Sequence, residues 1–333
     1  LLLVDQVHAV LGRQRADGPR SGWLSGLDEQ EGAAHPTIGG LRIGKEMNER
    51  KQGVPFDEQL EWDRDGQYYH YLIQWMHGLD RVSVVTGDPI YNRWAMELAK
   101  TAHARFVYRP EGGGQKRIYW KMSIDLSYPL VSSMSQQDPL DGLITYSELQ
   151  ATARKYSGQS AWPDLSAEIA DMASICTGTI LVTDDPLSLG GLVTDAFKIA
   201  QLVVEDKFIQ ADLLEAVEAS SIIGLDSYVR EGSLSLPADY RLAFRELGLS
   251  IGLEAAQRLK GLLEQYAGVF KKHRSARSYL ESLMQYVPLR EKINAFWLEQ
   301  NNRESAYWMA HRNINMVMLA TSLAPDGYIM MIS

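Results

Sequence analysis

The chain has a single cysteine, Cys176, among its 333 residues. One thiol excludes an intramolecular disulfide and a thiolate-rich zinc site, because each needs two or more sulfur atoms. It also favours a reducing compartment, so we expect a cytoplasmic location. The chain opens at LLLVDQVHAVLG without a methionine or a basic segment, which leaves open whether a leader precedes it.

Long apolar runs and positive charge are also scarce. No uninterrupted apolar run approaches the ~20 residues that span a bilayer, so we expect no membrane helix. The formal net charge of -9 is spread along the chain, which disfavours binding to nucleic acid. With 45% hydrophobic and 23% charged residues, the composition is that of a globular protein, and we expect one domain over residues 1–333.

Strand-like alternation is rare, whereas helical spacing recurs from end to end, so we predict an all-α fold. The segment at 90–107 places its apolar residues on one stripe, as in a helix buried on one side. Other segments are apolar nearly all round, which is typical of helices covered on every side. These segments are 68–85, 143–153, 192–204, 242–253 and 306–323.

The two kinds of helix alternate along the chain. DPLDGLITYSELQATA, from Asp138, resembles DPLSLGGLVTDAFKIA, from Asp185, at an interval of about one helix pair. Counting such pairs predicts a toroid of about six helical hairpins whose apolar members form an inner ring. Asp-Pro also suits a helix start, because Asp caps free N–H groups and Pro fits the first turn, so capping is one interpretation of both acids.

The alternation, the hairpin count and the acid-led aromatic helices together resemble the (α/α)6 toroid of six-hairpin glycosidases, including the N-acylglucosamine 2-epimerase group. The segments that carry this resemblance are WDRDGQYYHYLIQWMHGL, DPLDGLITYSELQ and YWMAHRNINMVMLA. Members of that superfamily bind sugars in a funnel at one end of the inner helices. The resemblance covers most of the chain and implies a small-molecule or oligosaccharide substrate, but it is one of architecture and assigns no catalytic role.

Several acidic residues lie at or just before the starts of the predicted inner helices, where the sugar-binding funnel would form. Glycoside hydrolysis uses paired carboxyl groups, and acids at the starts of inner helices would converge at one mouth if those helices point the same way. The alternative is that each acid is a solvated cap. Our candidate catalytic carboxylates are Asp63, Asp65, Asp125, Asp138 and Asp141.

Histidines offer a second kind of chemistry. The resembling epimerases use histidine bases, and His311 is our best candidate, although lone histidines often serve packing. His70 and His77 share a helical face but lie about 10 Å apart, too far to chelate one ion, so we expect no metal. We expect no cofactor either. Either histidine could instead be bonded to a neighbour, and His70 is kept as a substrate-binding candidate.

Further substrate-binding candidates are aromatic or basic. In the non-helical segment 117–131, Trp120 could stack on a sugar while Lys121 bonds its hydroxyls; the alternative is that Trp120 anchors a long loop. Arg241 and Arg245 share a helical face that suits an anionic group, unless they form internal ion pairs with acids such as Glu246. Around His311, the candidates are Tyr307, Trp308 and Arg312.

We therefore predict a carbohydrate-active protein, first a hydrolase that uses two acids. The alternatives are a sugar epimerase or isomerase with a histidine base, and a non-catalytic sugar-binding or scaffold protein. The sequence leaves the sugar and the oligomeric state open.

Overall fold

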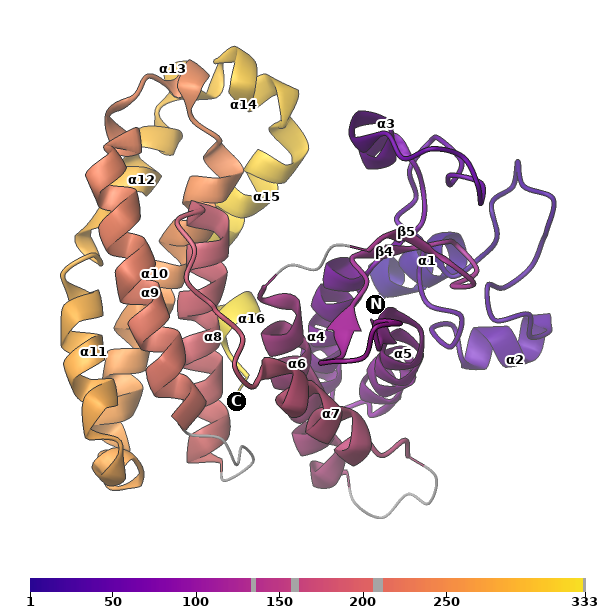
Figure 1. Cartoon of the computed structure of the whole chain (residues 1–333), viewed down its shortest axis with the longest axis horizontal. Coiled ribbons are helices and arrows are strands. Elements are labelled where there is room, and N and C mark those ends of the chain that lie inside the picture. Colours follow the sequence, from indigo (N-terminus) through magenta and orange to yellow (C-terminus); the bar gives the residue numbers. More distant parts are fainter. Residues whose placement is uncertain (133–135, 157–161, 206–211, 332–333) are drawn as a thin grey trace. The chain divides into compact units, whose positions relative to one another are not determined.

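The computed structural model describes residues 1–132, 136–156, 162–205 and 212–331. The chain divides into two compact units, Leu1–Thr179 (unit 1) and Ile180–Ser333 (unit 2), and each is described by itself. Helices dominate both units (Figure 1), which confirms the predominantly helical class. The closed ring of hairpins and the single domain stay predictions.

Unit 1 combines seven named helices with short strands. The strands form two small antiparallel sheets, ordered β1-β4-β5 and β2-β3. The helices are α1 (Leu2–Leu11), α2 (Glu29–Ala34), α3 (Glu58–Asp63), α4 (Tyr69–Thr86), α5 (Ile90–Phe106), α6 (Asp138–Lys155) and α7 (Ser166–Cys176). The strands are β1 (Gln67–Tyr68), β2 (Val107–Tyr108), β3 (Arg117–Ile118), β4 (Lys121–Met122) and β5 (Pro129–Val131).

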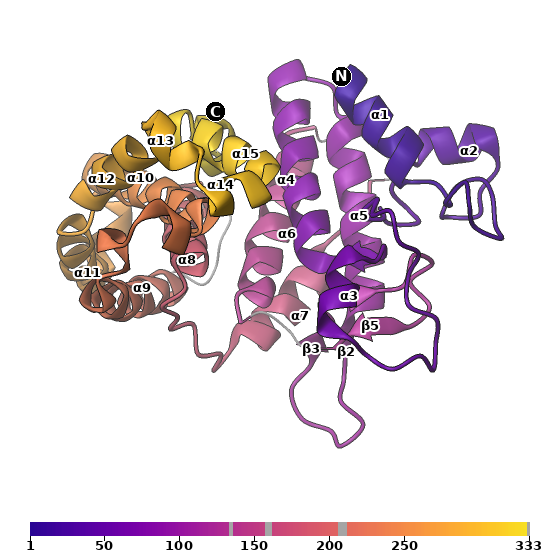
Figure 2. The ribbon, with the colours of Figure 1, turned by 90° about the horizontal axis from the view of Figure 1, so that it is seen from above.

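Helices α4 and α6 lie side by side and run parallel (Figure 2), because residues further along one helix contact residues further along the other. Polar pairs along their length join them, among them His70 with Asp141, His77 with Glu148, and Asp80 with Thr152, whose atoms are 3.7, 2.8 and 3.0 Å apart. The seven-residue spacing of the histidines is therefore matched by carboxylates at the same spacing on α6. It places two imidazole–carboxylate pairs two turns apart.

Unit 2 is built from long helices around an apolar core. The helices are α8 (Pro186–Val204), α9 (Asp212–Glu231), α10 (Ala243–Gln265), α11 (Arg274–Met284), α12 (Pro288–Leu298), α13 (Gln300–Arg303), α14 (Ala306–Ala310), α15 (Arg312–Leu323) and α16 (Asp326–Ile329), with 3-10 turns η1 (Ser233–Ser235), η2 (Ala238–Tyr240) and η3 (Val269–Lys272). The core between them includes Leu189, Val193, Leu247, Leu253 and Trp297.

The backbones of α8 and α10 touch at glycines. A Cβ added to Gly190 would lie 2.1 Å from the carbonyl oxygen of Gly248, so no larger residue fits there without moving a helix. The starts of the two helices are joined by Arg245 and Asp185, whose charged atoms are 2.5 Å apart. Helices α8 and α10 therefore begin at the same end of unit 2, as α4 and α6 do in unit 1.

Most of the predicted apolar segments lie within helices, although several of these helices extend beyond the segment. Segments 68–85, 143–153, 192–204 and 242–253 fall almost wholly within α4, α6, α8 and α10, and each is largely buried. The prediction of one helix covered on all sides at 306–323 is wrong. The helix breaks at His311 into α14 and α15, and apolar side chains such as Met309 and Val317 are exposed.

Among the described residues, α8 is the one helix long and apolar enough to cross a bilayer by length and composition. Of its most apolar window, 72% is buried. Burial of that extent is what the core helix of a globular unit requires, and the cytoplasmic location stays a prediction.

Glu218 on α9 is fully buried, and among the described residues neither of its carboxyl oxygens has a hydrogen-bond partner. Burial, with a smaller effect from the charge of Glu215, raises the pKa of Glu218 to about 9. The folded chain therefore holds a proton there that an unfolded chain releases near pH 4.5. The contribution of Glu218 to the free energy of unfolding therefore falls as the pH rises from about 4.5 to about 9.

We therefore expect Glu218→Gln to flatten the dependence of stability on pH. Between these two pH values, the ionisation of Glu218 changes the free energy of unfolding by at most about 1.4 kcal/mol per pH unit. Urea unfolding at several pH values between 5 and 9 measures the difference between variant and parent. Glu231→Gln, at an exposed glutamate on the same helix, is the control, and equal slopes for parent and Glu218→Gln would contradict the expectation.

Candidate functional site

The parallel packing of α4 and α6 brings a histidine and two aspartates together at the starts of these helices. We call His70, Asp138 and Asp141 the helix-start site. One donor atom from each side chain lies within 4.8 Å of the others. Asp138 is 2% exposed, Asp141 is half-buried and His70 is exposed, so the site is anchored inside and open on one side.

Two buried tyrosines lie between α4 and α6 beside this site. The hydroxyl oxygens of Tyr69 and Tyr146 are 3.1 Å apart. Burial, with the neighbouring Tyr146 and the charges of Asp138 and Asp141, raises the pKa of Tyr69 well above its usual value. A Cβ at Gly142 would lie 2.4 Å from the Tyr69 hydroxyl oxygen, so a glycine is needed on α6 to admit that ring. Tyr69 therefore stays neutral and holds the starts of the two helices together.

Four aromatic residues, which we call the aromatic group, lie beside the start of α4. The Tyr69 N–H donates to the carbonyl oxygen of Trp120 at 3.2 Å, because β1 and β4 pair just before α4. The ring of Trp120 is 5.1 Å from those of Trp62 and Tyr68, and Tyr68 is 5.3 Å from Tyr71. Trp62 and Tyr71 are about half exposed, at 50% and 53%, so the group presents aromatic surface to solvent.

The helix-start site could hold a metal ion. Imidazole nitrogen and carboxylate oxygen are both common ligands of divalent cations. The spacing of His70 and His77 along the sequence indicated no shared ion, and it gave no sign of this combination. The two carboxylates come from another helix, and only the parallel packing of α4 and α6 brings them to His70.

The capping interpretation separates the two Asp-Pro acids. Asp185 is the N-cap of α8, and its side chain accepts from the Ser188 N–H at 2.9 Å, which confirms that interpretation. Asp138 is the first residue of α6 and not its N-cap. Its carboxylate belongs to the helix-start site, so Asp138 and Asp185 differ in role despite the same sequence context.

Three further carboxylates predicted in unit 1 lie elsewhere. Asp63 is exposed at the end of α3. Asp65 is fully buried, and its Oδ2 accepts from Arg15 and Arg42 at 3.1 and 3.0 Å. Asp125 forms an ion pair with Arg20 at 2.7 Å on the turn after β4. The environment of Asp65 is that of a structural ion-pair centre.

Lys121 is fully buried rather than directed to a ligand. Its ammonium donates to the backbone carbonyls of Glu61 and Arg64 at 2.7 and 2.9 Å, and it lies 3.2 Å from the Glu61 carboxylate. Burial lowers the pKa of Lys121, which the Glu61 charge opposes. These partners favour a structural role that ties the end of α3 to β4.

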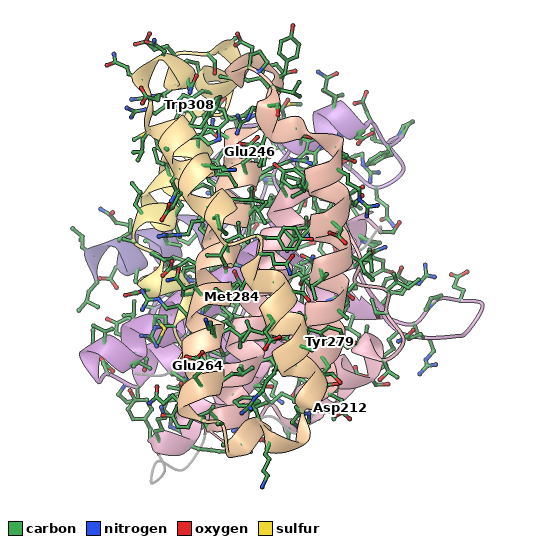
Figure 3. All side chains as sticks on the ribbon, turned by 90° about the vertical axis from the view of Figure 1, so that its left-hand side faces the viewer. Asp212, Glu246, Glu264, Tyr279, Met284 and Trp308 are labelled. Carbon is green, nitrogen blue, oxygen red and sulfur yellow. The ribbon has the colours of Figure 1, made fainter. Side chains whose placement is uncertain are left out.

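Arg241 and Arg245, which were predicted to bind an anionic group or else to form internal ion pairs, form ion pairs. Arg241 donates to both carboxylate oxygens of Glu246, and Trp297 donates to Glu246 at 2.8 Å. Trp308 is buried and stacks on Trp297 at 5.5 Å, at the same end of unit 2 as Glu246 (Figure 3). Arg245 pairs with Asp185 at the start of α8.

The remaining candidates of unit 2 are on its surface. Tyr307, His311 and Arg312 are exposed around the break between α14 and α15. The ring of His311 is 5.6 Å from that of Phe244. His311 therefore lies in unit 2, whereas His70, which shares the helix-start site with two carboxylates, lies in unit 1.

No protein-family model matches the chain, and no curated protein or solved structure matches it. The resemblance to six-hairpin glycosidases therefore stays a prediction that rests on architecture. Of the aromatic group, only Trp120 was predicted from the sequence, and Trp62, Tyr68 and Tyr71 were not. The segment WDRDGQYYHY contains four aromatic residues within ten positions, and this density could have indicated an aromatic surface here.

Proposed function

We propose that the chain is a carbohydrate-active enzyme that holds a sugar against the aromatic group, with the reacting carbon at the helix-start site. The observation that carries this proposal is the convergence of His70, Asp138 and Asp141 beside exposed aromatic surface. Aromatic rings pack on the apolar face of a sugar, while imidazole and carboxyl groups supply the proton transfers of sugar chemistry.

Hydrolysis of a glycosidic bond is the first reaction we propose. It needs one carboxyl group as acid and a second as base or nucleophile, which Asp138 and Asp141 supply. Their donor atoms lie within 4.8 Å of each other, closer to the carboxyl spacing of about 5–5.5 Å in retaining enzymes than to the 6.5–9.5 Å or so in inverting ones. A retained anomeric configuration is the expected outcome.

Epimerisation is the second candidate, and the pairing of His70 with Asp141 favours it. An imidazole beside a carboxylate is oriented to remove or return a proton, which is the step that epimerisation requires. In this version His70, in place of His311, is the base. Both reactions need acid–base groups gathered at one end of parallel helices, and the parallel pair α4/α6 of unit 1 supplies such a place.

Replacement of Trp120 tests the sugar-binding surface. We expect Trp120→Ala to weaken sugar binding about tenfold, or about 1.4 kcal/mol, because the sugar loses one aromatic face. Calorimetric titration with a panel of mono- and disaccharides measures this change. Trp162→Ala, which removes a half-buried tryptophan stacked on Tyr156, is the matched control. If no sugar in the panel binds, or if both variants lose affinity equally, the proposal fails.

A further inference from the structure

Two hollows in unit 1 share a wall made of Asn48 and Glu49. The smaller hollow, of about 130 Å³, also meets Arg20 and Asp125. The larger one, of about 470 Å³, also meets Met47 and Val54. An engineered cavity of about 150 Å³ accepts benzene, so the smaller hollow admits part of a sugar ring, and because the hollow is partly open to solvent the rest of the ring would extend out of it.

The carboxyl groups of this wall are fixed by the protein itself. Glu49 accepts from the Ile124 N–H at 2.5 Å. Asp125 accepts from the hydroxyls of Ser123 and Ser127 at 2.9 and 2.5 Å, and from Arg20 at 2.7 Å. A ligand would therefore meet polar groups that are already ordered, which reduces the entropy lost on binding.

The protonation of the two carboxyl groups differs. Burial raises the pKa of Glu49, the hydrogen bond from Ile124 opposes this, and the charge of Asp125 adds to it. Burial also raises the pKa of Asp125, but hydrogen bonds from Ser127, Arg20 and Ser123 outweigh it and lower the value to about 2. Asp125 is thus an acceptor, whereas Glu49 takes up a proton more readily and can then donate.

The chemistry of the lining selects an uncharged ligand rich in hydroxyl groups. The two hollows are lined by charges of both signs: the carboxylates disfavour an anion and the basic groups disfavour a cation. The carboxylates are Glu46, Glu49 and Asp125, and the basic residues are Arg15, Arg20, Lys51 and Arg64. Hydroxyl groups both donate and accept, so they match a carboxylate, an amide and a guanidinium at once. Met47 and Val54, each 40% exposed, add apolar surface in the larger hollow.

We propose that these hollows form a second binding site, for a neutral oligosaccharide, with one ring beside Asp125 and Arg20 and the next ring over Met47 and Val54. Asn48 and Glu49 bond the hydroxyl groups near the linkage between the two rings. This site is formed by loops before α3 and after β4 and involves none of the residues of the helix-start site or the aromatic group. The inference therefore does not depend on the proposed enzymatic activity.

The test is carried out on the full chain with maltose and cellobiose as probes. We expect Glu49→Gln and Asn48→Ala each to weaken disaccharide binding at least fivefold in calorimetric titration. Glutamine can still accept from the Ile124 N–H, so the melting temperature of Glu49→Gln should match that of the parent. Asn301→Ala, at an exposed asparagine on α13, is the control for Asn48→Ala.

Trp120→Ala distinguishes the two proposed sites. Disaccharide binding that persists in Trp120→Ala and is lost on adding Glu49→Gln supports the second site. The inference is overturned if Trp120→Ala alone abolishes all disaccharide binding, if Asn301→Ala has the same effect as Asn48→Ala, or if neither disaccharide binds.

Discussion

Replacing Asp65 with alanine is expected to destabilise the fold by about 3–5 kcal/mol, the usual cost of breaking a buried ion pair by removing one partner. The Asp65 carboxylate is fully buried and holds Arg15 and Arg42, whose side chains are only 11% and 13% exposed. It also accepts from the Gly44 N–H at 2.8 Å. The variant would leave two guanidinium groups and a backbone donor without this acceptor.

Urea unfolding followed by tryptophan fluorescence measures this loss. Asp17 is the matched control, because it pairs with the same Arg15 at 2.8 Å but from an exposed position. Asp17→Ala is expected to leave stability unchanged, since exposed ion pairs are screened by solvent. Similar unfolding midpoints for Asp65→Ala and the parent would contradict the view of Asp65 as a structural centre and would return it to the list of catalytic candidates.

The second large effect concerns turnover. On a sugar that the chain epimerises, the reaction in which His70 is the base, we expect His70→Gln to lower the rate by about 10²–10⁴-fold, the usual contribution of a general base. Glutamine retains polarity and approximate size but cannot exchange a proton near neutral pH. The exposed position of His70 makes a folding defect small, so the melting temperature should be unchanged.

His311→Gln is the control, because the sequence alone favoured His311 as the base. It should turn over substrate like the parent, and a loss in His311→Gln with none in His70→Gln would refute the assignment. Product analysis by NMR separates the two reactions. Release of a new reducing end indicates hydrolysis, whereas an inverted ring carbon without cleavage indicates epimerisation.

Local patterns in the sequence predicted several of the long, buried helices correctly. Helices α4, α6, α8 and α10 are apolar on several sides, and such segments need cover whatever the topology is. The N-cap at Asp185 was also predictable, because a cap depends on residues within one turn. The segment 306–323 failed, because its apolar residues suggested burial on all sides, whereas the chain breaks at His311 and leaves several of them exposed.

The candidate site was only partly predictable. Asp138, Asp141, His70 and Trp120 were each named from the sequence, and Asp138 and Asp141 lie one turn apart, but nothing in the sequence brought these acids to His70 or Trp120. Asp65 and Lys121 looked equally suitable, since both lie next to aromatic segments. Their partners Arg15, Arg42 and Glu61 come from other parts of the chain, and those contacts bury both charges.

By itself, the amino-acid sequence determined that this protein is helical, which segments are buried and which residue types could perform acid–base chemistry. Hydrophobic periodicity and capping act over a few residues, so they can be read along the chain. Tertiary structure alone decided which acids are buried in ion pairs and which meet His70 beside exposed aromatic rings. The reason is that the parallel register of α4 and α6 arises from packing between distant segments, and a shift of one turn, about 5.4 Å, would separate His70 from both aspartates.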